Sequence, residues 1–144
     1  MTVTLAELVK MSQAELDEVY CNGPIGTIPD GSGKGTAIIM PGSPMTEGMT
    51  SLVNVLAWQG KVFNRERGYL LNKVGPLSWE LVDAKVYVGN SWLCEDESII
   101  IDYSQSSFFL AQPIRDEIRE VAPNLYLGNA YWDQTRVLNF ALEF

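Results

Sequence analysis

After Gly60 the sequence becomes a regular alternation of short β-prone runs and turn signals, at intervals of about ten residues. This spacing is typical of an antiparallel meander, in which tight turns join neighbouring strands. The last run, 136–144, places Leu138, Phe140, Leu142 and Phe144 on one face, so that face is expected to be core. The runs are 61–63, 69–74, 79–88, 97–104, 114–121, 125–132 and 136–144.

A further apolar run begins at Ala37 and brings the strands to about eight. That number is enough to close a barrel with room for one small ligand, and closure removes exposed strand edges. We therefore predict a mainly β, antiparallel, closed or nearly closed barrel of about eight strands with short N-terminal helices. The 144 residues are expected to form a single domain, 1–144.

The N-terminal segment, 1–22, carries two capping boxes in series, starting at Thr4 and Ser12. They predict two short helices that form a lid or plug for the barrel. Residues 23–50 are rich in Gly and Pro and predict loops with one strand, whereas 51–144 is expected to form the barrel core. Within that core, 51–58 fits either a helix or a strand.

The chain carries a net charge of −8 and contains no histidine. An acidic surface repels a phosphate backbone, and no apolar run approaches the ~20 residues of a membrane span, so neither nucleic acid nor a membrane is expected as a partner. Without imidazole, Ser-His-Asp chemistry, a haem proximal ligand and the usual zinc site are excluded. We expect no metal and no cofactor; the expected partner is a small molecule, with a homodimer as a further expectation.

Cys21 and Cys94 are too few for a disulfide framework and lack a CxxC spacing, so they are interpreted as free thiols. The N-terminus has no basic region ahead of a hydrophobic stretch, as a secretory signal would require. Both observations favour the cytoplasm.

The stretch Gly31-Ser32-Gly33-Lys34-Gly35-Thr36 is similar to a phosphate-binding loop. A Walker loop needs a glycine where this chain has Ile28 and a hydroxyl where it has Gly35. Nucleotide binding is therefore not expected here.

Residues 114–121 are a candidate for chemistry, and they fit either a strand or a helix. As a strand, the segment places Arg115, Glu117 and Arg119 on one face. If that face points into the lumen, Arg115 or Arg119 would hold an anion while Glu117 transfers a proton. The alternative is a solvated charge ladder on the outside of the barrel.

A second candidate is Asp102-Tyr103, which follows three isoleucines. Asp102 would transfer a proton if burial raises its pKa, or would lie at the wet end of its strand. Tyr103 or Tyr126 would stabilise the charge that develops on the substrate during proton transfer. Further candidate ligand-binding residues are Trp58, Lys61 and Asn72; Lys61, if buried, would need a carboxylate partner.

Several segments, namely Trp58-Gln59-Gly60-Lys61, 99–103, 114–120 and 124–128, resemble uncharacterised bacterial proteins of lipocalin-like (calycin) build. That resemblance implies a barrel around a small apolar or amphipathic molecule. If the arginines of 114–121 face the lumen, they could bind a carboxylate on that molecule. In residue types alone, the chain is also similar to phenolic acid decarboxylases, which use Tyr, Arg and Glu without a cofactor. The expected function is thus small-molecule binding, with a cofactor-independent lyase, isomerase or cyclase as the alternative.

Overall fold

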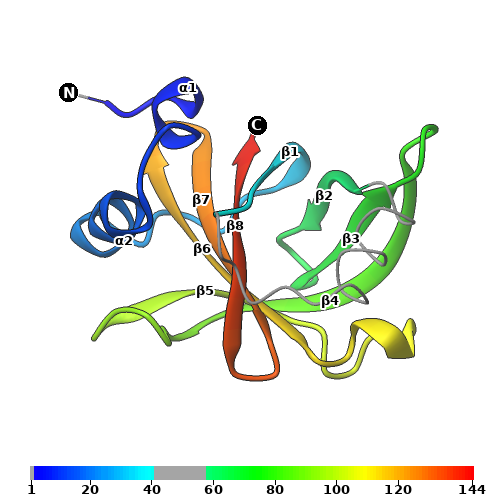
Figure 1. Cartoon of the computed structure of the whole chain (residues 1–144). Coiled ribbons are helices and arrows are strands. Elements are labelled where there is room, and N and C mark those ends of the chain that lie inside the picture. The colour runs from blue at the N-terminus through cyan, green and yellow to red at the C-terminus, as the bar shows by residue number, and fades with distance from the viewer. Residues whose placement is uncertain (1, 41–57) are drawn as a thin grey trace.

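The computed structural model describes residues 2–40 and 58–144, which form a closed barrel of eight antiparallel strands with two short helices against its outside (Figure 1). The predicted fold class is confirmed. The elements are α1 (Leu5–Leu8), α2 (Gln13–Asn22), β1 (Gly31–Ile38), β2 (Trp58–Asn64), β3 (Tyr69–Val74), β4 (Trp79–Asn90), β5 (Glu97–Asp102), the 3-10 turn η1 (Phe109–Ala111), β6 (Ile114–Ala122), β7 (Leu125–Trp132) and β8 (Thr135–Glu143).

Each strand pairs with the next in the sequence, and β1 pairs with β8 to close the barrel, with Ala37 opposite Phe140. Because every pairing is antiparallel, the connections alternate between the two ends. The β2–β3, β4–β5 and β6–β7 turns lie at one end, which we call the far end. The β3–β4, β5–β6 and β7–β8 connections lie at the other, which we call the mouth.

The first strand begins at Gly31, six residues earlier than the predicted start at Ala37. Its glycines allow aromatic rings inside the barrel to approach the backbone. A Cβ atom on Gly33 would lie 2.5 Å from the ring of Phe144, and one on Gly35 would lie 2.4 Å from the ring of Trp58. The stretch similar to a phosphate loop is therefore a barrel strand shaped for close packing.

The barrel interior is filled with apolar side chains toward the far end, where Phe63, Tyr126 and Phe144 meet edge to face. A second apolar layer lies outside the wall, where Leu16 and Tyr20 of α2 pack with Leu127 of β7. The helices thus cover the outer face of the barrel, and the expectation that they form a lid or plug is wrong. The apolar side chains of the two helices are buried against the outer face of the barrel wall.

The two predicted helix starts are confirmed, since Thr4 and Ser12 both complete capping boxes with the glutamate three residues later. Helix α2 ends at Asn22, at the predicted end of the helical segment 1–22. The ambiguous segment 114–121 is a strand, β6. Of the ambiguous segment 51–58, residues 51–57 lie outside the described residues, and Trp58 begins β2.

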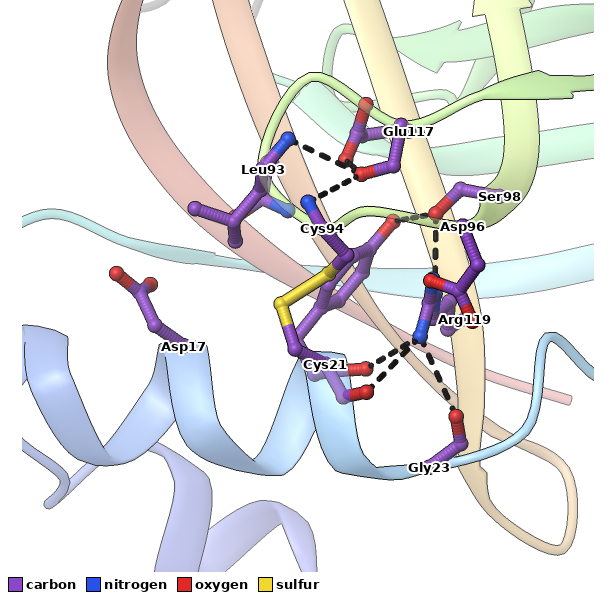
Figure 2. The surroundings of a disulfide bond; sticks show 12 residues. Asp17, Cys21, Gly23, Leu93, Cys94, Asp96, Ser98, Glu117 and Arg119 are labelled. Atoms are coloured by element: carbon purple, nitrogen blue, oxygen red, sulfur yellow. Dashed lines mark hydrogen bonds and ion pairs between the residues drawn. A yellow bond between two sulfur atoms is a disulfide. The ribbon is translucent and has the colours of Figure 1, made fainter.

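Cys21 and Cys94 form a disulfide, so the expectation of free thiols is wrong (Figure 2). Cys21 lies in the last turn of α2 and Cys94 in the β4–β5 turn, with their Cα atoms 5.6 Å apart. They are 73 positions apart in the sequence, and only the fold brings them together. Because disulfides are typical of oxidising compartments, the expectation of a cytoplasmic location loses the support of two free thiols.

Candidate functional site

The mouth half of the barrel contains an internal cavity of about 140 Å³. Its walls are almost entirely apolar and come from most strands and from the β5–β6 connection. The polar side chains that reach it are Lys61, Asn72, Tyr103 and Asp116. The other lining residues are Ala37, Trp58, Val74, Val82, Phe108, Ala111, Ile114, Ala130, Tyr131, Trp132, Val137, Leu138 and Phe140.

Lys61 lies at the centre of this group, which we call the lumen cluster: Lys61, Asn72, Tyr103 and Asp116. Its ammonium nitrogen lies 2.6 Å from the Tyr103 hydroxyl, 2.7 Å from Asn72 Oδ1 and 3.2 Å from Asp116 Oδ2. The Lys61 side chain is 4% exposed and that of Asp116 is 5% exposed. A buried lysine thus has the carboxylate partner that burial requires.

The neutral members of the lumen cluster are held in fixed orientations. Asn72 Oδ1 accepts from Lys61 and from Trp58 Nε1, while Asn72 Nδ2 donates to the Tyr103 hydroxyl at 2.8 Å and to the Val82 carbonyl at 2.9 Å. Tyr103 accepts from both Lys61 and Asn72. Because its oxygen accepts two hydrogen bonds, the hydroxyl proton of Tyr103 is left as a donor.

A β-bulge brings Trp58 and Lys61 to the same face of β2. Residues three apart in a regular strand point to opposite faces, but the register between β2 and β3 shifts between Trp58 and Gly60. Gly60 has a φ of +145° and lies against β1, where a Cβ atom would be 2.1 Å from the Gly33 carbonyl oxygen. Glycine is required there by both the conformation and the contact.

Backbone strain lies at the edge of the cavity. Val82 has a φ of +60°, which is an outlier for a β-branched residue, and it occupies a second register shift, between β3 and β4. Its carbonyl accepts from Asn72, and its side chain lines the cavity. Strain of this kind is retained where the surrounding structure fixes it, often at binding sites.

Burial sets the electrostatics of the lumen cluster. It raises the pKa of Asp116 above its ordinary value even though Lys61 and Tyr103 act in the opposite sense. Burial also raises the pKa of Tyr103, so its hydroxyl stays protonated. Burial alone would lower the pKa of Lys61, but Tyr103 and Asp116 outweigh it, and the pKa of Lys61 is raised. The cavity therefore contains a basic carboxylate beside two protonated donors.

The structure brings together four of the residues singled out in the sequence: Trp58, Lys61, Asn72 and Tyr103. Sequence reasoning missed Asp116. It shares the inner face of β6 with Ile114 and Ile118, both packed in the inner core. A lone carboxylate between isoleucines on an apolar face was the signal that could have found it.

Arg115, Glu117 and Arg119 lie on the opposite face of β6 from Asp116, outside the barrel, so their placement in the lumen is wrong. The alternative of a solvated ladder is also wrong, because Glu117 and Arg119 are fully buried. Glu117 accepts from Arg115 at 2.8 Å and from Ser91 at 2.5 Å. The β4–β5 turn and α2 cover these charges (Figure 2).

The last two candidates are also away from the cavity. Asp102 points outward and accepts from Tyr87 and Ser104. Burial acts to raise its pKa, but these hydrogen bonds outweigh it and the pKa is lowered, which contradicts the raised value considered from the sequence. Tyr126 lies at the far end, where its hydroxyl donates to the Thr27 carbonyl at 2.5 Å.

Within residues 2–40 and 58–144, no group of three His, Cys, Asp or Glu side chains could hold a metal ion. In the same part of the chain, no helix has the length and apolar character to cross a bilayer.

Fold and cavity define the class: an eight-stranded, antiparallel, closed β-barrel protein with an internal cavity at its mouth. A protein from Thermomonospora curvata, solved as a crystal structure, has the same build, with a TM-score of 0.62 over 92% of this chain and 87% of that chain. At 19% sequence identity this likeness shows the fold alone. No protein-family model matches the chain. No curated protein is similar to it at a significant level.

Proposed function

We propose that the protein is a lipocalin-like binding barrel, and that its ligand is a small, mainly apolar molecule with one polar group. The observation that carries this proposal is the cavity of about 140 Å³, apolar except for the lumen cluster. Ligand sites are commonly apolar pockets with a few fixed polar groups. A protein cavity of about 150 Å³ is known to hold benzene, so a single-ring molecule is the right size here.

The lumen cluster favours an uncharged polar group on the ligand. Lys61 and Asp116 form an ion pair, so the cluster as a whole carries no net charge. A ligand carboxylate would bring an uncompensated negative charge beside Asp116, at the cost of burying a charge. A hydroxyl or carbonyl can share the donors of Tyr103 and Lys61 without that cost.

The experiment is a thermal shift and NMR titration with phenol, cyclohexanone and benzoate. Phenol and cyclohexanone should raise the melting temperature and shift the resonances of the cavity residues, whereas benzoate should do neither. Ala130→Leu, which fills the cavity from β7, should abolish binding. Val88→Leu enlarges an exposed side chain on β4 and is the matched control. Equal binding by both variants would contradict the proposal.

A further inference from the structure

We infer that the lumen cluster catalyses proton transfer on a bound ketone. Asp116 would remove a proton from the carbon beside the carbonyl group, while Tyr103 and Lys61 hydrogen bond the carbonyl oxygen as it becomes negative. This inference rests on the proposed function, because the ketone must first occupy the cavity. It adds a reaction and a substrate class to the binding of a small molecule.

The positions of the three groups fit these roles. Tyr103 and Lys61 are 2.6 Å apart, so both can donate to a single oxygen atom. Asp116 lies 3.2 Å from Lys61, next to those donors, and lines the same cavity. In a ketone, the distance from the carbonyl oxygen to the carbon beside the carbonyl group is of the same order as the distance between these donors and Asp116. One bound molecule can therefore contact the donors and the base together.

A ligand oxygen would also change the hydrogen bonds of the carboxylate. In the free protein, Lys61 forms an ion pair with Asp116 at 3.2 Å, and both Lys61 and Tyr103 favour the charged form of this carboxylate by lowering its pKa. When Tyr103 and Lys61 donate to the ligand oxygen instead, Asp116 loses the partners that stabilise its charged form. The carboxylate of Asp116 then becomes a stronger base. Asn72, fixed by Trp58 and Val82, keeps the Tyr103 hydroxyl in place during this exchange.

The reaction balances without a co-reactant. Asp116 takes the proton of a C–H bond, and the electron pair of that bond forms a C=C bond as the carbonyl oxygen becomes an enolate. Tyr103 and Lys61 stabilise this oxygen in a mainly apolar environment, where their hydrogen bonds are stronger than in bulk water. In a β,γ-unsaturated ketone, Asp116 then delivers the proton to the γ carbon. In a saturated ketone, the proton on Asp116 first exchanges with solvent, and Asp116 then delivers a solvent proton to the original carbon. The net result is proton exchange or an allylic isomerisation.

The apolar walls and the volume of the cavity select the substrate class. A single-ring, uncharged ketone fits about 140 Å³, and a phosphate or a carboxylate on the substrate would have no free cation to meet in the lumen cluster. The inferred substrate is thus an enolisable cyclic ketone. Cyclohexanone and cyclohex-3-en-1-one are suitable probes, since the second one isomerises to the conjugated ketone with a change in ultraviolet absorbance.

The experiment measures hydrogen–deuterium exchange of cyclohexanone by NMR and isomerisation of cyclohex-3-en-1-one by absorbance. We expect the wild-type protein to accelerate both, and Asp116→Asn to lose at least ~100-fold of that rate. Because Asp116→Asn leaves Lys61 buried without its carboxylate and can fail to fold, Tyr103→Phe provides a second test with the ion pair intact. Asp102→Asn, a carboxylate on the outer face, is the matched control and should retain the full rate.

Two results would overturn the inference and leave the proposed function standing. The first is a ketone that shifts the resonances of cavity residues but reacts no faster than in buffer. The second is a protein that binds phenol in the cavity but binds neither ketone. Loss of rate in Asp102→Asn with retention in Asp116→Asn and Tyr103→Phe would also contradict it. Failure of every probe, phenol included, to bind would overturn the proposed function itself.

Discussion

Arg119 of β6 closes the C-terminal end of α2: its guanidinium donates to the carbonyl oxygens of Tyr20 at 3.2 Å and of Cys21 at 3.3 Å. The same group donates to the Gly23 carbonyl, to Ser98 Oγ and to Asp96 (Figure 2). The last turn of α2 has no basic residue of its own. A cation from the barrel wall thus satisfies the free carbonyl groups of the helix end and complements its dipole.

Arg119→Met should therefore lower the free energy of unfolding by about 3 kcal/mol or more, because several buried acceptors lose a charged donor. The amide hydrogens of α2 should exchange faster with solvent, while those of β2 and β3 should change little. Urea denaturation and hydrogen exchange measure the two effects. Arg136→Met is the matched control: Arg136 pairs with Asp17 in a partly exposed position and should cost ~1 kcal/mol or less.

Removing the disulfide should destabilise the fold strongly. The Cys21–Cys94 bond closes a loop of 73 residues, for which the loop-entropy relation gives about 4 kcal/mol. Cys21→Ser/Cys94→Ser should lower the urea midpoint accordingly, and reduction of the wild-type protein with dithiothreitol should give the same midpoint. A double variant as stable as the oxidised protein would contradict this expectation.

The effects of substituting Lys61 and Asp116 on the free energy of unfolding should be strongly coupled, because the two residues form a buried ion pair. Lys61→Met leaves the Asp116 carboxylate buried without its cation and should cost about 3 to 5 kcal/mol. Adding Asp116→Asn removes the uncompensated charge, so the double variant should be more stable than Lys61→Met alone. Lys73→Met, on the exposed face of β3, is the control and should change stability by less than ~0.5 kcal/mol. Wild type, Lys61→Met, Asp116→Asn and the double variant form a double-mutant cycle, measured by urea denaturation.

Tyr126 should make stability fall at high pH. Burial, with the nearby Glu120 charge, raises its pKa to about 12 from an ordinary value of 10.0. Its contribution is fully present below pH 10 and is lost as the pH rises toward 12, since the unfolded chain releases the proton first. Urea denaturation across this window should show a steeper decline for wild type than for Tyr126→Phe. Identical slopes would contradict the assigned pKa.

Much of the fold could be predicted because strand periodicity is local. The alternation through 136–144 shows which face of β8 is core, and Thr4 and Ser12 mark the helix starts. The start of β1 could not be predicted, because a run of glycines is typical of a loop. Only the fold shows that these glycines make room for the rings of Trp58 and Phe144. The Cys21–Cys94 bond depends on contacts distant in sequence.

The candidate site was predictable in part for the same reason. Residue type alone selected Lys61, Asn72 and Tyr103. A strict two-residue period would place Trp58 and Lys61 on opposite faces of β2, and only the bulge at Gly60 brings both side chains to the cavity. On β6, the period correctly grouped Arg115 with Glu117 and Arg119. It could not show which face points inward, nor that α2 would cover the outer one.

Two of the links that fasten α2 to the barrel, the disulfide and the Arg119 contacts, join it to the β4–β5 turn and to β5 and β6, away from the mouth. A partly exposed ion pair between Asp17 and Arg136 joins α2 to β8 as well. The disulfide and the Arg119 contacts therefore lie at the opposite end of the barrel from the cavity. Leu138 and Phe108 line the cavity and are not among the residues of the outer apolar layer that holds the helices. A substitution at either position is therefore expected to reshape the cavity without loosening α2.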